Sequence, residues 1–134
     1  MTLDELMLKY PEPFTQPPPC GACIGDGWVP LIERILVAAP PGLKVEQIKE
    51  KFGGLRFYYG LTEEVSDEEA SAFLLVVGDA EGKSFKTCEQ CGAPGRTVGH
   101  GWAYTACESH MEERDRRVVQ DAGQPAPADQ PSEG

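Results

Sequence analysis

Four residues near the C-terminal end of the chain form its clearest chemical pattern: Cys88, Cys91, Cys107 and His110. Two residues separate the members of each pair, and fifteen residues separate the pairs. Three thiolates and one imidazole are a ligand set of closed, structural zinc sites, and a two-residue spacer lets both members of a pair reach one ion. The pattern therefore predicts one tightly held structural Zn²⁺. The alternative is two chance half-motifs whose cysteines are buried or disulfide-bonded.

The residues around these ligands indicate a small metal-binding fold. The segment Gly92-Ala-Pro-Gly95 after the first pair is typical of a tight turn. The second pair opens a predicted helix from Met111 to Gln120, which contains two favourable charge pairs four residues apart, Glu112 with Arg116 and Glu113 with Arg117. A knuckle, a short hairpin and a helix that carries the last two ligands predict a treble-clef-like zinc finger over residues 88–118.

A second cysteine pair, Cys20-Gly-Ala-Cys23, is half of a metal site. A second zinc would need two more ligands, and His100 is the one histidine outside the first set, so an acidic residue or another chain would have to contribute. A redox Cys-x-x-Cys would need a thioredoxin-like strand-to-helix setting, which the following Gly25-Asp-Gly-Trp28 does not supply. We favour two free, partly buried thiols.

Composition narrows the class of protein. The chain has 134 residues, enough for one modest domain, with 22 acidic and 12 basic residues and a formal charge of -10. Such a charge disfavours broad phosphate binding, since that needs clustered Lys and Arg. The sequence contains no apolar run close to the about 18 residues of a membrane span. Paired cysteines suit metal binding in a reducing compartment, so we expect a soluble protein in the cytoplasm of a host cell.

The N-terminal half predicts two helices and a hairpin. Residues 2–10 read as a short helix with a capping box, followed by a proline-rich strap. An amphipathic helix begins at Asp26, and its apolar face comprises Trp28, Leu31, Ile32, Ile35, Leu36 and Ala39. Two β-rich arms over residues 45–59 flank Gly53-Gly54, which predicts a hairpin with the diglycine in its turn and three basic residues at its tip, Lys49, Lys51 and Arg56.

A further helix is predicted after Ser66, a suitable N-cap. Five acidic residues surround its start: Glu63, Glu64, Asp67, Glu68 and Glu69. Its expected buried face is Ala70, Phe73, Leu74 and Val77, and Gly78 and Gly82 are expected to bend or end it. The prediction is thus an α+β fold, with helices around a β-hairpin and a C-terminal treble-clef-like finger. Residues 1–120 form one zinc-stabilised domain, and residues 121–134 are too polar to fold and form a disordered tail.

Four segments carry a resemblance to a known group of proteins: Gly25-Asp-Gly-Trp28, residues 47–59 (QIKEKFGGLRFYY), Cys88-x-x-Cys-Gly-x-Pro-Gly95 and Trp102-x-x-Thr-x-Cys-x-x-His110. Over about residues 1–118 the chain resembles small, largely uncharacterised proteins of phages, prophages and their bacterial hosts. The resemblance implies a C-terminal zinc finger and a mobile-element setting. The pair Cys20 and Cys23 departs from the pattern of the group.

Three functions are compatible with these patterns. The favoured one is a non-enzymatic zinc-binding accessory protein of a phage or prophage, which acts by binding a host or phage protein and could inhibit an antiviral defence system, as an anti-CRISPR does. Its predicted partner-binding residues are the five acids above together with Lys49, Lys51 and Arg56. The alternatives are a nucleic-acid-binding treble clef and a metal-dependent nuclease, for which only His100 would be spare as a general base.

Overall fold

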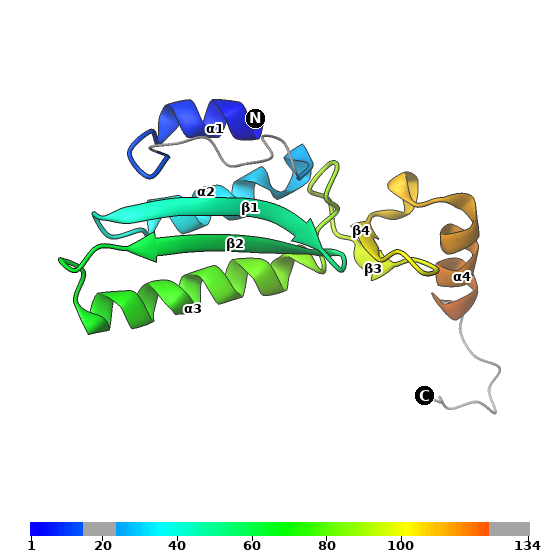
Figure 1. Ribbon diagram of the computed structural model, residues 1–134. Coiled ribbons are helices and arrows are strands. Elements are labelled where there is room, and N and C mark those ends of the chain that lie inside the picture. The colour runs from blue at the N-terminus through cyan, green and yellow to red at the C-terminus, as the bar shows by residue number, and fades with distance from the viewer. Residues whose placement is uncertain (15–23, 124–134) are drawn as a thin grey trace.

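The computed structural model describes residues 1–14 and 24–123, and Figure 1 shows their arrangement. The described elements, in chain order, are α1 (Leu3–Lys9), the 3₁₀ helix η1 (Asp26–Trp28), α2 (Val29–Val37), β1 (Leu43–Lys51), β2 (Gly54–Leu61), α3 (Asp67–Ser84), β3 (Arg96–Val98), β4 (Tyr104–Ala106), the 3₁₀ helix η2 (Glu108–His110) and α4 (Glu113–Gly123). Helices and two small antiparallel sheets confirm the predicted α+β class.

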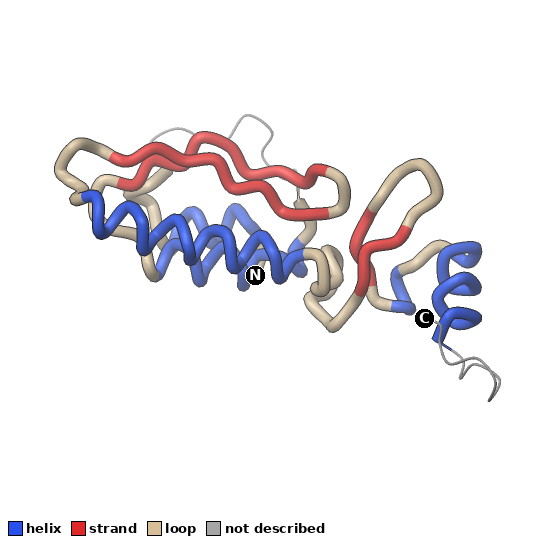
Figure 2. Tube along the Cα trace, turned by 90° about the horizontal axis from the view of Figure 1, so that it is seen from below, coloured by secondary structure: helices blue, strands red, loops and turns tan. Residues whose placement is uncertain are grey.

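The hairpin β1–β2 packs one of its faces on α2 and α3. In the view from below (Figure 2), both helices lie along the same side of the two strands. Alternation along β1 turns Leu43 and Val45 inward, and the irregularity in register between Val45 and Gln47 lets Ile48, three residues farther on, face inward as well. Phe57 of β2 pairs with Ile48 in the register of the hairpin. These side chains meet Ile32 of α2 and Phe73 of α3 in one hydrophobic core. The other face of the hairpin, where the intervening residues point, is not covered by these two helices.

The predicted helix starts are confirmed by their caps. Thr2 and Ser66 each accept a hydrogen bond from the backbone three residues on, and Glu5 and Glu69 return the bond to the cap residue. Each capping box satisfies two backbone N–H groups that the first helical turn would leave unpaired. The predicted apolar face of the second helix is also confirmed, since Trp28, Leu31, Ile32, Ile35 and Leu36 are buried and Ala39 packs partly buried against them.

The turn of the hairpin differs from the prediction by one residue. The two loop residues are Phe52 and Gly53, with φ of 55° and 88°, and Gly54 already pairs with Lys51 as the first residue of β2. Two positive φ values are typical of the type I′ turn, whose twist matches that of the strands. Gly54 is required elsewhere: a Cβ on it would lie 2.2 Å from Cζ of Phe85.

Helix α3 also differs from the prediction, in its buried face and in its length. Phe73, Val77, Ala80 and Ser84 are buried, whereas Leu74 is 59% exposed and the predicted burial of Leu74 is wrong. One stripe of α3 faces the hairpin, and Leu74 lies about 100° away from Phe73 around the helix. The helix runs unbroken through Gly78 and Gly82, and a Cβ added to either glycine would meet nothing within 4 Å.

Residues 1–14 and 24–123, the part that the structure describes, contain two separate hydrophobic clusters. The larger one belongs to the helix–hairpin layer, formed by α1 and residues 24–84. The smaller one, Cys88, Ala106, Met111 and Val119, belongs to the C-terminal finger, residues 88–123. Figure 1 shows this finger, yellow to orange, beyond the turn end of the hairpin. The finger thus meets the layer at that end.

The C-terminal boundary of the fold lies beyond the predicted one. Helix α4 continues to Gly123, past the boundary predicted at residue 120, while the rest of the predicted tail lies outside the described residues. The same holds for Cys20 and Cys23, so the interpretation of that pair stays a prediction. Among the helices that the structure describes, none combines the length and apolar character needed to cross a membrane.

Candidate metal centre

The structure brings the four predicted ligands together. One ligand atom from each of Cys88, Cys91, Cys107 and His110 lies within 4.8 Å of the other three. The Sγ atoms of Cys91 and Cys107 are 3.7 Å apart, and Nδ1 of His110 lies 3.5 Å from Sγ of Cys88 and 3.2 Å from Sγ of Cys107. This cluster could hold a metal ion, as the spacing of the residues predicts.

The first two ligands lie on a tight knuckle. The backbone N–H of Cys88 donates to the carbonyl of Ala93 over 2.8 Å, and the N–H of Gly92 donates back to the carbonyl of Cys88 over 2.9 Å. Gly92 has a φ of 82°, a conformation that glycine adopts readily and other residues rarely do. The predicted tight turn at Gly92 is therefore what folds the chain back and turns both thiols to the same point.

The last two ligands, Cys107 and His110, precede α4 and do not lie on it. The prediction that the C-terminal helix carries them is therefore wrong. Cys107 caps η2, His110 ends it, and Met111 is extended before α4 begins at Glu113. The guanidinium of Arg116 reaches back to the carbonyls of Glu108 and Met111, at 2.8 and 2.9 Å. These bonds stabilise the break between η2 and α4.

Of the two predicted charge pairs on this helix, only one forms. Arg117 and Glu113 are 2.9 Å apart, as predicted. Arg116 does not pair with Glu112, because its guanidinium binds backbone carbonyls instead. The helix is further held by Tyr104, whose hydroxyl donates to the buried Asp115 and accepts from the backbone N–H of Glu112.

The backbone around Cys88 favours its thiolate. Burial works to raise the pKa of the Cys88 thiol, but hydrogen bonds from the backbone of Cys107, Cys91 and Gln90 outweigh it and lower the pKa from 9.0 to about 6. A thiolate is the form of cysteine that ligates metal ions. The knuckle thus presents at least one ligand in the charge state that a metal ion requires.

The Gly-Asp-Gly-Trp motif positions this knuckle, a role that its sequence does not reveal. The backbone N–H of Gly27 donates to the carbonyl of Glu89 over 2.7 Å, and the indole N–H of Trp28 donates to the carbonyl of Thr87 over 2.8 Å. A Cβ on Gly27 would lie 2.2 Å from the carbonyl oxygen of Cys88 and 2.5 Å from the backbone nitrogen of Gly92. The two backbones can therefore approach this closely only because residue 27 is glycine.

Glu89 also binds the motif through its side chain. Its carboxylate accepts a 3.0 Å hydrogen bond from the backbone N–H of Gly25. Burial raises the pKa of this carboxyl, and the bond from Gly25 opposes that rise. Glu89 stands between two ligands in the sequence, and nothing in its type or spacing distinguishes it from the acids on the surface.

The turn of the hairpin makes a second contact with the finger. The hydroxyl of Thr105, which is buried, donates to the carbonyl of Gly53 over 2.6 Å and lies 2.6 Å from the hydroxyl of Thr97. Thr97 in turn donates to the carbonyl of Phe85. The second motif of the resemblance, Phe-Gly-Gly, thus contacts the segment around Thr105, which lies in the fourth motif.

The remaining predicted residues fall into two groups that the structure keeps apart. Lys49, Lys51 and Arg56 lie near the turn of the hairpin. The five acids from Glu63 to Glu69 lie at the other end of β2, in the connection to α3 and in its first turn, on the far left in Figure 1. They do not form one surface.

Comparisons with protein-family models, with curated proteins and with solved structures give no match for this chain.

Proposed function

We propose that this chain is a non-enzymatic zinc-binding protein, in which one structural Zn²⁺ holds a treble-clef-like finger and the rest of the molecule binds another protein. The observation that carries the proposal is the ligand geometry. Zinc bonds of about 2.3 Å to sulfur and about 2.0 Å to nitrogen make tetrahedral edges of about 3.8 Å between two sulfurs and about 3.5 Å between sulfur and nitrogen. The corresponding separations here are 3.7 Å between Cys91 and Cys107, 3.5 Å between Cys88 and His110, and 3.2 Å between Cys107 and His110.

A closed ligand set gives the metal a structural role and no direct role in binding substrate. Four protein ligands fill a tetrahedral zinc, so that no position is left for a substrate or an activated water. When bound, the ion would join the knuckle around Cys88 to the segment around Cys107, which are far apart in sequence. The work of the protein must then be done by surfaces that the zinc-held finger helps to shape.

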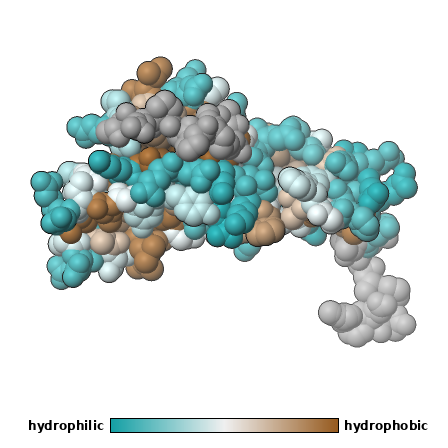
Figure 3. Space-filling model, in the orientation of Figure 1, coloured by the Kyte–Doolittle hydropathy of each residue, from teal (hydrophilic) through white to brown (hydrophobic). Residues whose placement is uncertain are grey.

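The groove between α2 and α3 is the surface that best fits a protein partner. It has a volume of about 660 Å³. Val37 on α2 and Leu75 on α3 line it and are 67% and 75% exposed. Leu74 adds a third exposed aliphatic side chain on α3, and in Figure 3 brown, apolar side chains gather over α3 at the lower edge of the molecule. Exposed apolar surface beside a groove is typical of protein-binding sites.

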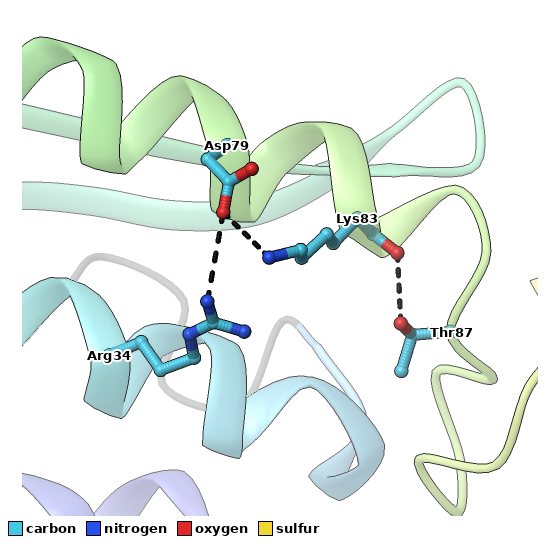
Figure 4. Close-up of polar contacts among 4 residues, drawn as sticks. All are labelled: Arg34, Asp79, Lys83 and Thr87. Carbon is cyan, nitrogen blue, oxygen red and sulfur yellow. Dashed lines mark hydrogen bonds and ion pairs between the residues drawn. The ribbon is translucent and has the colours of Figure 1, made fainter.

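One ion pair joins the two helices along this groove, and a second lies within α3. Asp79 of α3 lies 2.9 Å from Lys83 and 3.8 Å from Arg34 of α2, as Figure 4 shows. The hydrogen bond from Lys83 is the main cause of the lowered pKa of Asp79, which therefore stays charged. One carboxylate thus faces two cations in the groove, Arg34 and Lys83. The densest acidic charge lies farther along α3, at its first turn.

This combination defines the partner by its chemistry. A helix or loop with an apolar face and basic residues at one end would place the apolar face in the groove and the basic residues on Glu63, Glu64 and Glu68. In the phage setting that the resemblance implies, a nucleic-acid-binding protein of an antiviral defence system has such basic surfaces. We therefore propose inhibition of such a protein, as by an anti-CRISPR, as the function.

Charge reversal tests this proposal. A partner is first captured with the zinc-loaded chain from bacteria that carry defence systems, and its association rate is then measured. Reversal of Glu63, Glu64 and Glu68 to Lys is expected to slow association by about tenfold or more at low ionic strength, and less as salt is added. The matched control reverses three exposed acids elsewhere, Asp4, Glu12 and Glu46. Equal rates for the two triple variants would contradict the proposal.

A further inference from the structure

Two exposed aromatic rings line one hollow where the hairpin meets the finger. Phe52 in the hairpin turn is 71% exposed and Trp102 in the β3–β4 loop is 76% exposed. Both rings line a hollow of about 370 Å³, together with Glu50, Lys51 and the small residues Gly101 and Ala103. They come from segments about fifty residues apart in sequence, and the packing of the finger on the turn brings them to one place.

The backbone holds both rings in place. The N–H of Gly53 donates to the carboxylate of Glu50 over 2.7 Å, and the carbonyl of Gly53 accepts from the buried hydroxyl of Thr105 over 2.6 Å. Phe52 has a φ of 55°, the left-handed conformation that the first loop residue of a type I′ turn requires. The turn leaves its ring exposed at the end of the hairpin.

Cations without acidic partners continue this surface along the hairpin. Lys49 and Arg56 are cross-strand neighbours, and Lys51 lies two residues farther toward the turn on the same face. The ammonium of Lys49 lies 5.4 Å from the ring centre of Tyr58, and that of Lys51 lies 5.6 Å from the ring centre of Phe52. Among the described residues, neither these lysines nor Arg56 takes part in an ion pair. Rings and free cations therefore alternate along the face.

The acidity of the protein does not cancel this local charge. The acids from Glu63 to Glu69 lie beyond the opposite end of the hairpin, and β1 has nine residues, which at about 3.3 Å per residue span roughly 25 Å. The screening length at physiological salt is about 8 Å. Near the turn end, Lys49, Lys51 and Arg56 therefore outnumber the one carboxylate that lines the hollow, that of Glu50, which the N–H of Gly53 already binds.

We infer that this face, formed by Phe52, Tyr58 and Trp102 with Lys49, Lys51 and Arg56, binds single-stranded nucleic acid. Flat rings on which bases stack, next to cations that meet the phosphates, are the elements of such sites. Of the arginines of α4, by contrast, two are engaged within the finger: Arg116 binds backbone carbonyls and Arg117 pairs with Glu113. The inference does not depend on the protein-binding surface at α3.

Fluorescence anisotropy with fluorescein-labelled oligo(dT) and the zinc-loaded full chain tests the inference. We expect saturable binding that weakens with salt, and weaker binding to a duplex of equal length because its bases are already stacked. Trp102→Ala should weaken binding by about tenfold or more, the usual effect of losing one stacked base, and Trp102→Phe should restore part of it. Since Trp102 is exposed, its replacement should leave the fold intact, which circular dichroism checks.

A pair of charge reversals supplies the matched control. Lys51→Glu should weaken binding and lower the slope of log affinity against log salt, by about 0.7 for each phosphate that the protein no longer neutralises. Lys44→Glu makes the same change of charge on the same strand but at its far end, and should behave like the unchanged chain. Absence of oligo(dT) binding at low salt, equal affinity for the duplex, or equal effects of the two reversals would overturn the inference. Preference for an acidic protein over oligo(dT) at this face would also overturn it.

Discussion

The helix–hairpin layer and the C-terminal finger differ in what can hold each of them folded. The layer has seventeen buried residues in one core. The finger buries four, one of them the ligand Cys88. Since each fully buried aliphatic or aromatic side chain contributes about 1.5–3 kcal/mol, burial stabilises the finger, for its length, much less than it stabilises the layer. We therefore expect the finger, but not the layer, to depend on the proposed metal for its folding.

The contacts within the layer also differ in kind from the contacts between the layer and the finger. Within the layer, side chains pack on side chains. At the junction, backbone meets backbone at Gly27, and polar bonds from Trp28 and Thr105 cross over to the other region. Such a junction needs accurate geometry on both sides, and on the side of the finger we expect the proposed metal to supply it by fixing the knuckle. Loss of the metal should therefore undo the junction but spare the core of the layer.

The largest expected effect comes from the ligands themselves. Cys107→Ser removes a thiolate from a complete ligand set. Loss of a residue that only hydrogen-bonds to a ligand lowers metal affinity by up to about 100-fold, so loss of the ligand itself should lower zinc affinity by more than that. The melt of the finger should be lost as well, because metal binding and folding are coupled. Cys20→Ser is the control, and its melting curve should match that of the unchanged chain. Equal melting shifts for the two variants would contradict the assignment of the ligands.

The next effect concerns the junction. Gly27→Ala places a methyl group 2.2 Å from the carbonyl oxygen of Cys88. Neither backbone can move far, so we expect a loss of about 1–3 kcal/mol in the free energy of unfolding, as for other overpacked sites. Urea denaturation of the zinc-loaded chain measures this loss. An unchanged midpoint would show that the close approach at residue 27 is not required.

The smallest effect should have the opposite sign. Gly78→Ala makes the same chemical change within α3, where the added methyl group meets nothing within 4 Å. Alanine is favoured over glycine inside a helix by about 0.5–1 kcal/mol. The same urea experiment should therefore show a gain in stability. A loss at residue 78 would mean that the exposed side of α3 is already in contact with something in solution.

Much of the fold can be predicted from the sequence, because local patterns determine it. The capping boxes, the apolar face of the second helix and the spacing of the four ligands depend on residues close together in the chain, and the structure contains all of them. The predicted hairpin has its turn one residue too late. The reason is not local: residue 54 must be glycine because the ring of Phe85, some thirty residues away in sequence, lies against its backbone.

The same limit explains what the sequence does not reveal about the site. The diglycine of the Phe-Gly-Gly motif predicts a turn. Gly54, however, must be glycine because the side chain of Phe85 lies against it, and Gly27 of the Gly-Asp-Gly-Trp motif must be glycine because the backbone of Cys88 lies against it. Periodicity alone places Leu74 in the core, since it cannot tell which apolar residues of α3 a neighbour covers. No sequence pattern links Phe52 with Trp102, because their proximity depends on the packing of the finger on the hairpin turn.

Amide hydrogen exchange, read by mass spectrometry with zinc bound and after chelation, tests the central claim most directly. Chelation is expected to remove protection from the knuckle and its surroundings, including the amides of Cys88, Glu89 and Gly92 that donate hydrogen bonds there. Protection in α2 and in the middle of β1, around Ile48, should persist. Unchanged protection throughout, or its simultaneous loss in both regions, would contradict the claim that the metal holds the finger and not the layer.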